Sequence, residues 1–369
     1  MKKTKFDSYC LKDFAVWENK KFSARQKSEG FLSVCKGCKY CVQGKKLVLF
    51  VSGKCSRTCK YCSLSNKRKN IDKTWANERE CKNISEILEE AKESHAFGAG
   101  ITGGDPLLCL GKTLKFVKAL KKKFGKKFHI HIYLPTNLVT LDKLRKLSRY
   151  IDEVRFHPKL LGNEKIIEGE LEKISLAGKF WKRENIGIEI PMFPEKVQET
   201  FYFIKSVSEL VGFVNLNELE ISDTNFNFIK LRYKLNNDTY TIKNSREAGL
   251  EILKRCEKER LGLKVHLCTA RTKNLFQYKN RIKLRDILPF GFRTKEGSVR
   301  YFAIYLKNKE ELDRFRKHIV GMEFYFDKKK NRIILSEKSG RRAFLLGYVV
   351  ERVEELPTFD AIELEREII

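Results

Sequence analysis

The chain has 369 residues, of which 42% are hydrophobic and 11% aromatic, so it can bury a large core and is not globally disordered. No stretch comes near 18 uncharged apolar residues, and the basic N-terminus has no apolar run after its lysines, so the sequence predicts neither a membrane span nor a signal peptide. We therefore expect a cytoplasmic protein. The net charge of +29 is typical of a protein that binds polyanions such as nucleic acid, or of a lysine-rich proteome.

Six of the eleven cysteines fall into two groups near the N-terminus. An odd number of cysteines in a cytosolic chain argues against a disulfide framework. The first group, Cys35, Cys38 and Cys41, precedes the first predicted strand. Its CxxCxxC spacing suits an iron–sulfur cluster, for which Cys10 or Cys268 would be the fourth ligand. A zinc site completed by a histidine, or free thiols, are the alternatives.

The second group is Cys55, Cys59 and Cys62, which stand in the loop after the predicted strand at residues 45–53. Three thiolates at this spacing can reach three corners of a [4Fe–4S] cluster, which normally takes four. One iron then stays open and can bind a small chelating cosubstrate. A zinc site is the alternative, but structural zinc prefers two well-separated CxxC pairs.

A second motif follows at the end of a short apolar segment. Residues 83–97 have apolar positions at helical spacing, and the segment after them ends in Gly103, Gly104, Asp105 and Pro106. Glycine allows a ligand to approach the backbone closely. On its own, this motif predicts only a turn.

The middle of the chain alternates strand and helix patterns. This alternation predicts βαβ units with a parallel sheet, and ligands then bind at the carboxyl ends of the strands. The six predicted strands span residues 45–53, 98–104, 128–136, 152–158, 185–194 and 216–224.

Several polar residues of these strands are candidates for the site. His129 and His131 share one face of their strand, where they either line the interior or are core histidines. Arg155 and His157 also share a face and are candidates for substrate binding or catalysis. Cys268 ends a later predicted strand and is a third candidate.

The pattern loosens after residue 225. The basic, helix-patterned segment 273–285 carries Phe276 and Tyr278 among its cations, so it is either a solvated face or a surface for nucleic acid or acidic peptide. The residues after this segment alternate apolar and polar side chains, a pattern that predicts β-strands. We expect three parts: a Cys-rich extension with a candidate auxiliary metal site over 1–44, an α/β domain over 45–288 and a β-rich C-terminal domain over 289–369.

These motifs resemble those of the radical S-adenosylmethionine family. CSRTCKYC matches the family's cysteine motif, with the aromatic Tyr61 just before the last cysteine. The family carries Gly-Gly-Glu-Pro where this chain has Gly-Gly-Asp-Pro, so Asp105 is shorter than the usual acid. Over about residues 30–285, strings such as GCKYCVQGKKLVLFVSG, ITGGDPL and EVRFHP are similar to an archaeal set of radical proteins related to the pyruvate formate-lyase activating enzyme.

The resemblance implies a partial (β/α)6 parallel barrel and a [4Fe–4S] cluster ligated by Cys55, Cys59 and Cys62. It implies reductive cleavage of S-adenosylmethionine to a 5′-deoxyadenosyl radical, which abstracts hydrogen from a substrate. An electron donor such as ferredoxin or flavodoxin is the implied partner. The residues that this reading places around S-adenosylmethionine are Tyr61, Gly103, Gly104, Asp105 and His131.

Three interpretations of the substrate remain. The positive charge and the β-rich appendage favour modification of RNA, with tRNA first. The resemblance favours an activase that modifies a partner protein. A non-catalytic zinc or iron–sulfur protein is the third interpretation, which leaves the Gly-Gly-Asp-Pro motif and the alternating pattern unexplained.

Overall fold

The computed structural model describes residues 34–159, 164–237, 240–319 and 321–369. Cys10 and most of the predicted N-terminal extension lie outside them. The chain divides into two compact units. The first comprises the described residues up to Lys92 together with Ala96–Tyr278, and the second comprises Glu93–His95 and Lys279–Ile369. The boundary predicted after residue 288 falls inside the second unit.

The first unit is built on a nine-stranded sheet in the order β3-β2-β1-β4-β5-β6-β7-β8-β9. The edge hairpin β2 (Thr74–Ala76) and β3 (Arg79–Cys81) pairs antiparallel to β1. The other seven strands are parallel: β1 (Lys46–Phe50), β4 (Gly98–Thr102), β5 (His129–Pro135), β6 (Glu153–His157), β7 (Ile186–Met192), β8 (Phe213–Glu218) and β9 (Lys264–Cys268).

The mixed α/β fold with a parallel sheet is therefore confirmed, with two differences from the predicted strands. The sixth strand spans Phe213–Glu218 rather than residues 216–224, and the later predicted strand that Cys268 ends is β9, a seventh parallel strand beside β8. The order of paired strands runs from β3 at one end to β9 at the other, and closure into a six-unit barrel stays a prediction.

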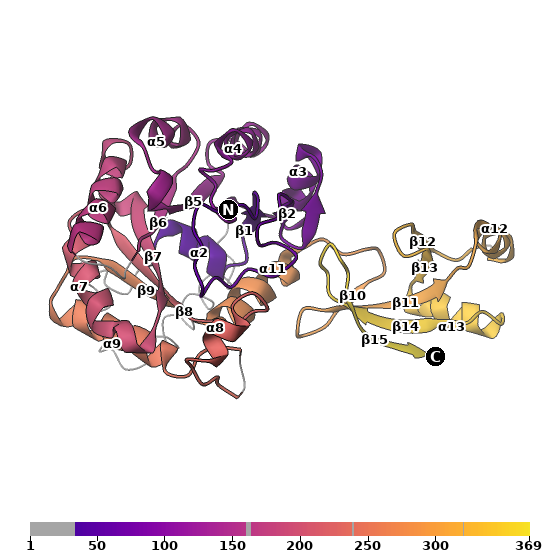
Figure 1. Ribbon diagram of the computed structural model, residues 1–369. Coiled ribbons are helices and arrows are strands. Elements are labelled where there is room, and N and C mark those ends of the chain that lie inside the picture. Colours follow the sequence, from indigo (N-terminus) through magenta and orange to yellow (C-terminus); the bar gives the residue numbers. More distant parts are fainter. Residues whose placement is uncertain (1–33, 160–163, 238–239, 320) are drawn as a thin grey trace. The chain divides into compact units, whose positions relative to one another are not determined.

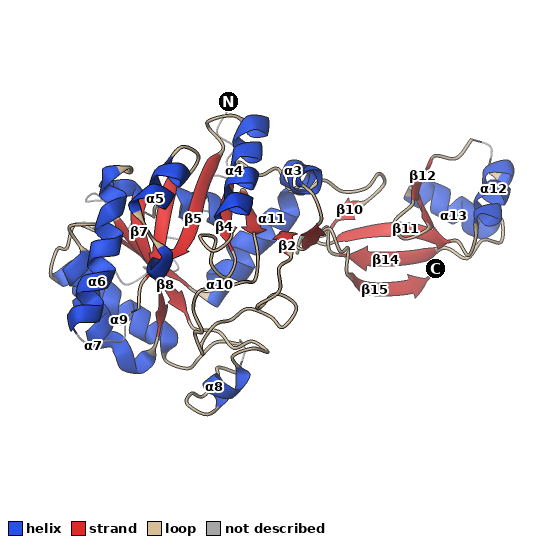
Figure 2. Ribbon diagram, turned by 45° about the horizontal axis from the view of Figure 1, so that its top comes forward, coloured by secondary structure: helices blue, strands red, loops and turns tan. Residues whose placement is uncertain are grey.

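Helices between the strands cover one face of the sheet, which we call the outer face (Figures 1 and 2). Leu47, Ile130 and Phe156 pack with these helices in the main core, because alternate strand residues point to the same face. The helices are α3 (Ile84–Glu93), α4 (Leu110–Phe124), α5 (Leu141–Ser148), α6 (Glu164–Ser175), α7 (Val197–Val207) and α9 (Ser245–Lys258).

The opposite face, which we call the inner face, contacts the N-terminal helix α2 (Lys36–Val42). The backbone N–H of Gly37 donates to Glu153 at 3.0 Å, and Phe213 packs with Cys35 and Cys38. The remaining short elements are α8 (Phe226–Lys230), α10 (Ala270–Thr272), a π-helix (Lys273–Tyr278), α11 (Lys279–Leu284) and 3-10 helices at Thr136–Leu138, Leu176–Lys179, Arg183–Asn185 and Pro194–Lys196.

The second unit is an antiparallel six-stranded sheet in the order β12-β13-β11-β14-β15, with β10 paired to β11. Its core includes Ile304, Phe315, Ile333 and Ala343. This sheet fits the predicted β-rich appendage. The elements are β10 (Phe292–Arg293), β11 (Val299–Tyr305), α12 (Lys309–His318), β12 (Phe324–Asp327), β13 (Arg332–Leu335), α13 (Glu337–Leu345), β14 (Glu351–Glu355) and β15 (Glu363–Ile368).

Across the described ranges of both units, every helix is too short or too polar to cross a membrane.

Candidate active site

A cavity of about 280 Å³ lies beyond the carboxyl ends of the parallel strands. Part of its wall is the segment after β1, residues 54–63, which we call the cysteine loop. The structure brings seven of the predicted site residues to this cavity: Cys55, Cys59, Tyr61, Cys62, Gly103, Gly104 and His157. Residues from two separate motifs therefore meet at one site.

The two glycines are required by the close packing of the β4 turn on the chain after β1. A Cβ at Gly104 would lie 2.3 Å from the Lys54 carbonyl oxygen, and one at Gly103 would lie 2.6 Å from the Ser52 carbonyl oxygen. Gly103 also has a φ of +153°, a backbone conformation that residues other than glycine rarely adopt. A larger residue at either position would push the cysteine loop away from β4.

Arg57, which stands between two of the cysteines, ties the loop to β5, β6 and α6. Its side chain is 7% exposed and forms an ion pair with Glu170 at 3.4 Å. The guanidinium also donates to the Thr136 hydroxyl and to the His157 carbonyl oxygen, both at 2.5 Å, and to Asn137 at 3.2 Å.

Asp105, in the turn after β4, makes a second tie to the loop. The residue is 1% exposed and does not line the cavity. One carboxylate oxygen accepts from the Leu107 N–H at 2.8 Å, and the other accepts from the Ser56 hydroxyl. The carboxylate predicted to bind S-adenosylmethionine is thus engaged by the protein's own donors.

A third tie comes from the segment after β8. The Thr224 hydroxyl donates to the Cys62 carbonyl oxygen at 2.9 Å, and the Asn225 amide donates to the Tyr61 carbonyl oxygen at 3.1 Å. The Tyr61 ring packs edge-on against Phe193, with the ring centroids 5.2 Å apart. The loop is therefore held from three directions.

The far wall of the cavity is polar and comes from β6, β8 and the π-helix. Burial lowers the pKa of His157, so its ring is neutral, and Nδ1 lies 3.1 Å from the Glu189 carbonyl oxygen. This contact makes Nδ1 the donor and leaves Nε2 as an acceptor. Lys273 pairs with Glu220 at 2.6 Å, and Asn217 and Glu218 complete the wall.

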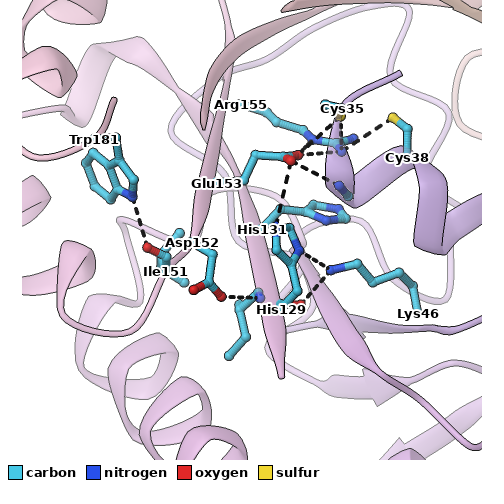
Figure 3. A network of polar contacts seen from close by, with 12 residues as sticks. Cys35, Cys38, Lys46, His129, His131, Ile151, Asp152, Glu153, Arg155 and Trp181 are labelled. Carbon is cyan, nitrogen blue, oxygen red and sulfur yellow. Dashed lines mark hydrogen bonds and ion pairs between the residues drawn. The ribbon is translucent and has the colours of Figure 1, made fainter. Parts of the chain in front are cut away.

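Besides Asp105, Cys35, Cys38 and Cys41, three predicted site residues lie away from the cavity. His131 and Arg155 are on the inner face (Figure 3) and are 1% and 2% exposed. His131 lies two inner-face positions before the carboxyl end of β5, and Arg155 lies one inner-face position before the carboxyl end of β6. Cys268 ends β9, but its thiol accepts from Gln277 at 3.4 Å. Unlike His157, none of the three lines the cavity.

The thiols of the cysteine loop can serve as ligands of an iron–sulfur cluster. Cys55, Cys59 and Cys62 all line the cavity, so one loop offers three of the four cysteine ligands that a [4Fe–4S] cluster normally takes. Burial raises the pKa of Cys55, so iron must displace a proton from this thiol.

The cations of segment 273–285 are largely engaged by acidic residues. Because an engaged cation is less available to phosphate, these pairs weaken the case for a nucleic-acid surface. Three of the five cations form ion pairs: Lys273 with Glu220 at 2.6 Å, Lys279 with Glu296 at 2.6 Å and Arg285 with Glu93 at 2.5 Å.

Comparison with known proteins identifies the family. Residues 42–166 match the family described as 4Fe-4S single cluster domain. A protein of Methanocaldococcus jannaschii named "Putative glycyl-radical enzyme activating enzyme" is 33% identical over 356 residues, which cover 92% of this chain and 93% of the relative. The chain belongs to the radical S-adenosylmethionine family. It is related to the pyruvate formate-lyase activating enzyme, and as a radical S-adenosylmethionine enzyme it uses a [4Fe–4S] cluster and S-adenosylmethionine.

Solved structures of the family are more distant. A structure described as native anSMEcpe with bound AdoMet is 17% identical, with a TM-score of 0.39 over 60% of this chain and 63% of that one. Coproporphyrinogen III oxidase of Escherichia coli is 14% identical, with a TM-score of 0.37 over 55% of this chain and 50% of that one. At these values we draw no conclusion from the structural similarity.

The residues that sequence reasoning missed are those that hold the cysteine loop. Arg57 stands between cysteines at a position for which the motif specifies no residue, and its partners are 79 to 113 residues away in the chain. Thr224 and Asn225 follow β8, which ends at Glu218 and not at residue 224 as predicted. No local pattern marks such contacts, because they depend on which strand ends become neighbours.

Proposed function

We propose that this radical S-adenosylmethionine enzyme is a glycyl-radical activating enzyme, which removes a hydrogen atom from a backbone glycine of a partner protein. The observation that carries this proposal is the similarity to the Methanocaldococcus jannaschii protein named for that activity. Because it covers 92% of the chain, the similarity extends over both units. The comparisons do not support RNA modification, the first interpretation of the charge.

In this proposal Cys55, Cys59 and Cys62 ligate the cluster, and Gly103 and Gly104 present their backbone to S-adenosylmethionine. When bound, the cluster and S-adenosylmethionine supply a hydrogen-abstracting radical. The protein orients the three thiols through the ties to the cysteine loop. The half-buried wall at His157 and Asn217 limits the access of water to the reacting atoms, which protects a reactive intermediate from side reactions.

Isotope transfer tests the identity of the hydrogen donor. The anaerobically reconstituted enzyme receives S-adenosylmethionine, dithionite and a proteome from source cells grown on glycine deuterated at Cα. We expect deuterium in the 5′-deoxyadenosine, and a glycyl-radical signal by electron paramagnetic resonance. A variant with Cys55, Cys59 and Cys62 replaced by Ala is the control and should give neither.

A parallel reaction with uniformly deuterated RNA from the same cells distinguishes the alternatives. Deuterium transfer from RNA and not from the glycine-labelled proteome would overturn the activase proposal. The activase proposal would also be overturned if a preparation that cleaves S-adenosylmethionine took deuterium from neither the proteome nor the RNA. In that case no glycine of the cell's proteins is the hydrogen donor.

A further inference from the structure

The second unit holds a cavity of its own, with a volume of about 760 Å³. The helices α12 and α13 pack on one face of the antiparallel sheet, and Tyr301 and Arg332 of the other face form the floor of this cavity. Its walls are the segments 285–288 and 355–359 and the turn 328–330. The volume lies within the range of small-molecule sites. None of the described residues that line it also lines the cavity at the cysteine loop.

The floor of this second cavity holds charges that balance one another. The Arg332 side chain is fully buried and pairs with Asp327 at 2.9 Å and with Glu355 at 2.8 Å. Lys330 also pairs with Glu355, at 2.7 Å. Because each of these charges has a partner of opposite sign, the floor neither attracts nor repels a charged ligand strongly.

The acidic side chains of the wall are engaged as well. Glu93 pairs with Arg285 at 2.5 Å, and Asp286 contacts His95 at 2.6 Å. Both acids line the cavity, together with the two acids of the floor. Since every acidic residue of the described lining contacts a cation or a histidine, the lining as a whole tolerates a negatively charged ligand.

Two lysines of the turn 328–330 differ from the other cations of the lining. Across the described ranges, Lys328 and Lys329 form no ion pair with an aspartate or a glutamate. The Lys329 ammonium donates to the Phe359 carbonyl oxygen and lies 3.8 Å from the centroid of the Phe359 ring. Partial burial and the nearby Arg285 guanidinium lower the pKa of this ammonium. An anion bound here would offset the repulsion between the two cations.

Aromatic rings line the cavity beside these lysines. Tyr325 is 37% exposed and Phe359 is half-buried, so part of each ring is open to a ligand. Cations next to exposed rings bind a flat base by stacking and its phosphate by charge. Two ammonium groups match the two negative charges that a phosphate monoester carries near neutral pH, whereas a carboxylate carries one. The lining therefore favours a nucleotide over an aromatic carboxylic acid.

We propose that the cavity of the second unit binds a nucleoside monophosphate, with the phosphate at Lys328 and Lys329 and the base against the exposed rings. This binding site goes beyond the proposed activase function. Because the two cavities share no lining residue among those described, the proposal holds whatever substrate the radical chemistry acts on.

Isothermal titration of the full chain tests this site. The protein is reconstituted anaerobically and saturated with S-adenosylmethionine, so that the cavity at the cysteine loop is filled, and is titrated with AMP, GMP, CMP and UMP. We expect at least one of these nucleotides to bind at one site per chain. The matching nucleoside lacks the phosphate and should bind about tenfold more weakly, because it loses the charged hydrogen bonds.

Two substitutions and a matched control assign the binding to this cavity. Lys329→Met removes a charged donor and should weaken nucleotide binding by about tenfold. Tyr325→Ala removes a stacking surface and should weaken it by about fivefold. Lys338→Met removes the same charge at an exposed position of α13 and should bind as the wild type does. Amide hydrogen exchange in β11 should be the same in all three variants, which shows that the second unit is folded.

The proposal is overturned if none of the four nucleotides binds at millimolar concentration, or if nucleoside and nucleotide bind equally well. Equal affinities of Lys329→Met and Lys338→Met would overturn it too. A chain with Cys55, Cys59 and Cys62 changed to Ala should keep the binding. Loss of binding from that variant would instead place the nucleotide in the cavity at the cysteine loop.

Discussion

Arg57 separates two proposed cluster ligands, and its own side chain is 7% exposed and bonded to other parts of the sheet. Its guanidinium reaches three segments, namely the end of β6, the turn after β5 and α6. A buried cation with a fixed carboxylate partner is a rigid connection, because separating the pair leaves a charge without solvent. The position of the three thiols thus depends on a residue that does not bind iron.

The first prediction concerns this ion pair. Arg57→Met leaves the 8% exposed Glu170 carboxylate without its cation. We expect the free energy of unfolding of the metal-free chain to fall by about 3–5 kcal/mol, and iron to be lost on gel filtration. Lys60→Met, at an exposed position of the same loop, is the control and should change stability by less than about 0.5 kcal/mol. Equal unfolding curves and iron contents for the two variants would refute the role of Arg57.

The second prediction separates two roles for Asp105. If the carboxylate holds the loop through Ser56, the substitutions Asp105→Ala and Ser56→Ala should be non-additive by about 0.5–3 kcal/mol in a double-mutant cycle of unfolding. Asp105→Asn should bind S-adenosylmethionine as the wild type does. A tenfold loss of affinity in Asp105→Asn, without a change in the unfolding midpoint, would instead show that the carboxylate contacts the cosubstrate.

At the scale of elements, the packing of α2 on the inner face depends on one glycine. A Cβ at Gly37 would lie 2.5 Å from the Arg155 guanidinium, 2.6 Å from the Glu153 carboxylate and 2.8 Å from His131 Nδ1. These three side chains are buried and engaged with one another or with neighbours, so they cannot move aside at low cost.

The third prediction therefore compares two helix glycines. Gly37→Ala should lower the free energy of unfolding by about 1–3 kcal/mol through overpacking. Gly111→Ala, in α4, meets nothing within 4 Å, and should leave stability unchanged or raise it by up to about 1 kcal/mol. Chemical denaturation measures both. If Gly37→Ala were as stable as Gly111→Ala, α2 would not pack on the sheet as described.

The elements show how far sequence reasoning reaches. Alternating apolar residues predicted the parallel strands, and the motif positions predicted that Cys55 and Gly103 meet at strand ends. The same alternation placed His131 and Arg155 on the inner face. However, the period of a strand predicts which face a side chain is on and not how far it lies from the carboxyl end of the strand. Both residues lie too far from the carboxyl ends of β5 and β6 to reach the cavity. The strand that Cys268 ends was predicted but was not counted among the six βα units, because the irregular segment after β8 interrupts the alternation before it.

At the scale of the whole molecule, each unit has its own hydrophobic core and its own buried ion pairs. In the second unit, Arg332 is fully buried and pairs with Asp327 at 2.9 Å and Glu355 at 2.8 Å. Units with separate cores can lose stability separately.

The fourth prediction uses this separation. Arg332→Met should destabilise the second unit by about 3–5 kcal/mol, so amide hydrogens in β11 and β14 should exchange faster. Exchange in β1 and β5, and cleavage of S-adenosylmethionine without substrate, should stay at wild-type levels. Arg341→Met, which removes a cation that is 75% exposed, serves as the control and should change neither. Faster exchange throughout the chain would show that the two units unfold together.

The three ties to the cysteine loop also set an order of events during synthesis. Tyr61 is held by Asn225, which is 164 residues further along the chain. At 5–20 residues per second, the ribosome adds Asn225 roughly 8–33 s after Tyr61. Throughout that interval the three thiols have emerged or are emerging without the contacts that arrange them, and they are open to oxygen and stray metal ions. Iron delivered before the segment after β8 is made would meet an unarranged loop, so cluster insertion belongs after translation, on a chain whose sheet is already complete.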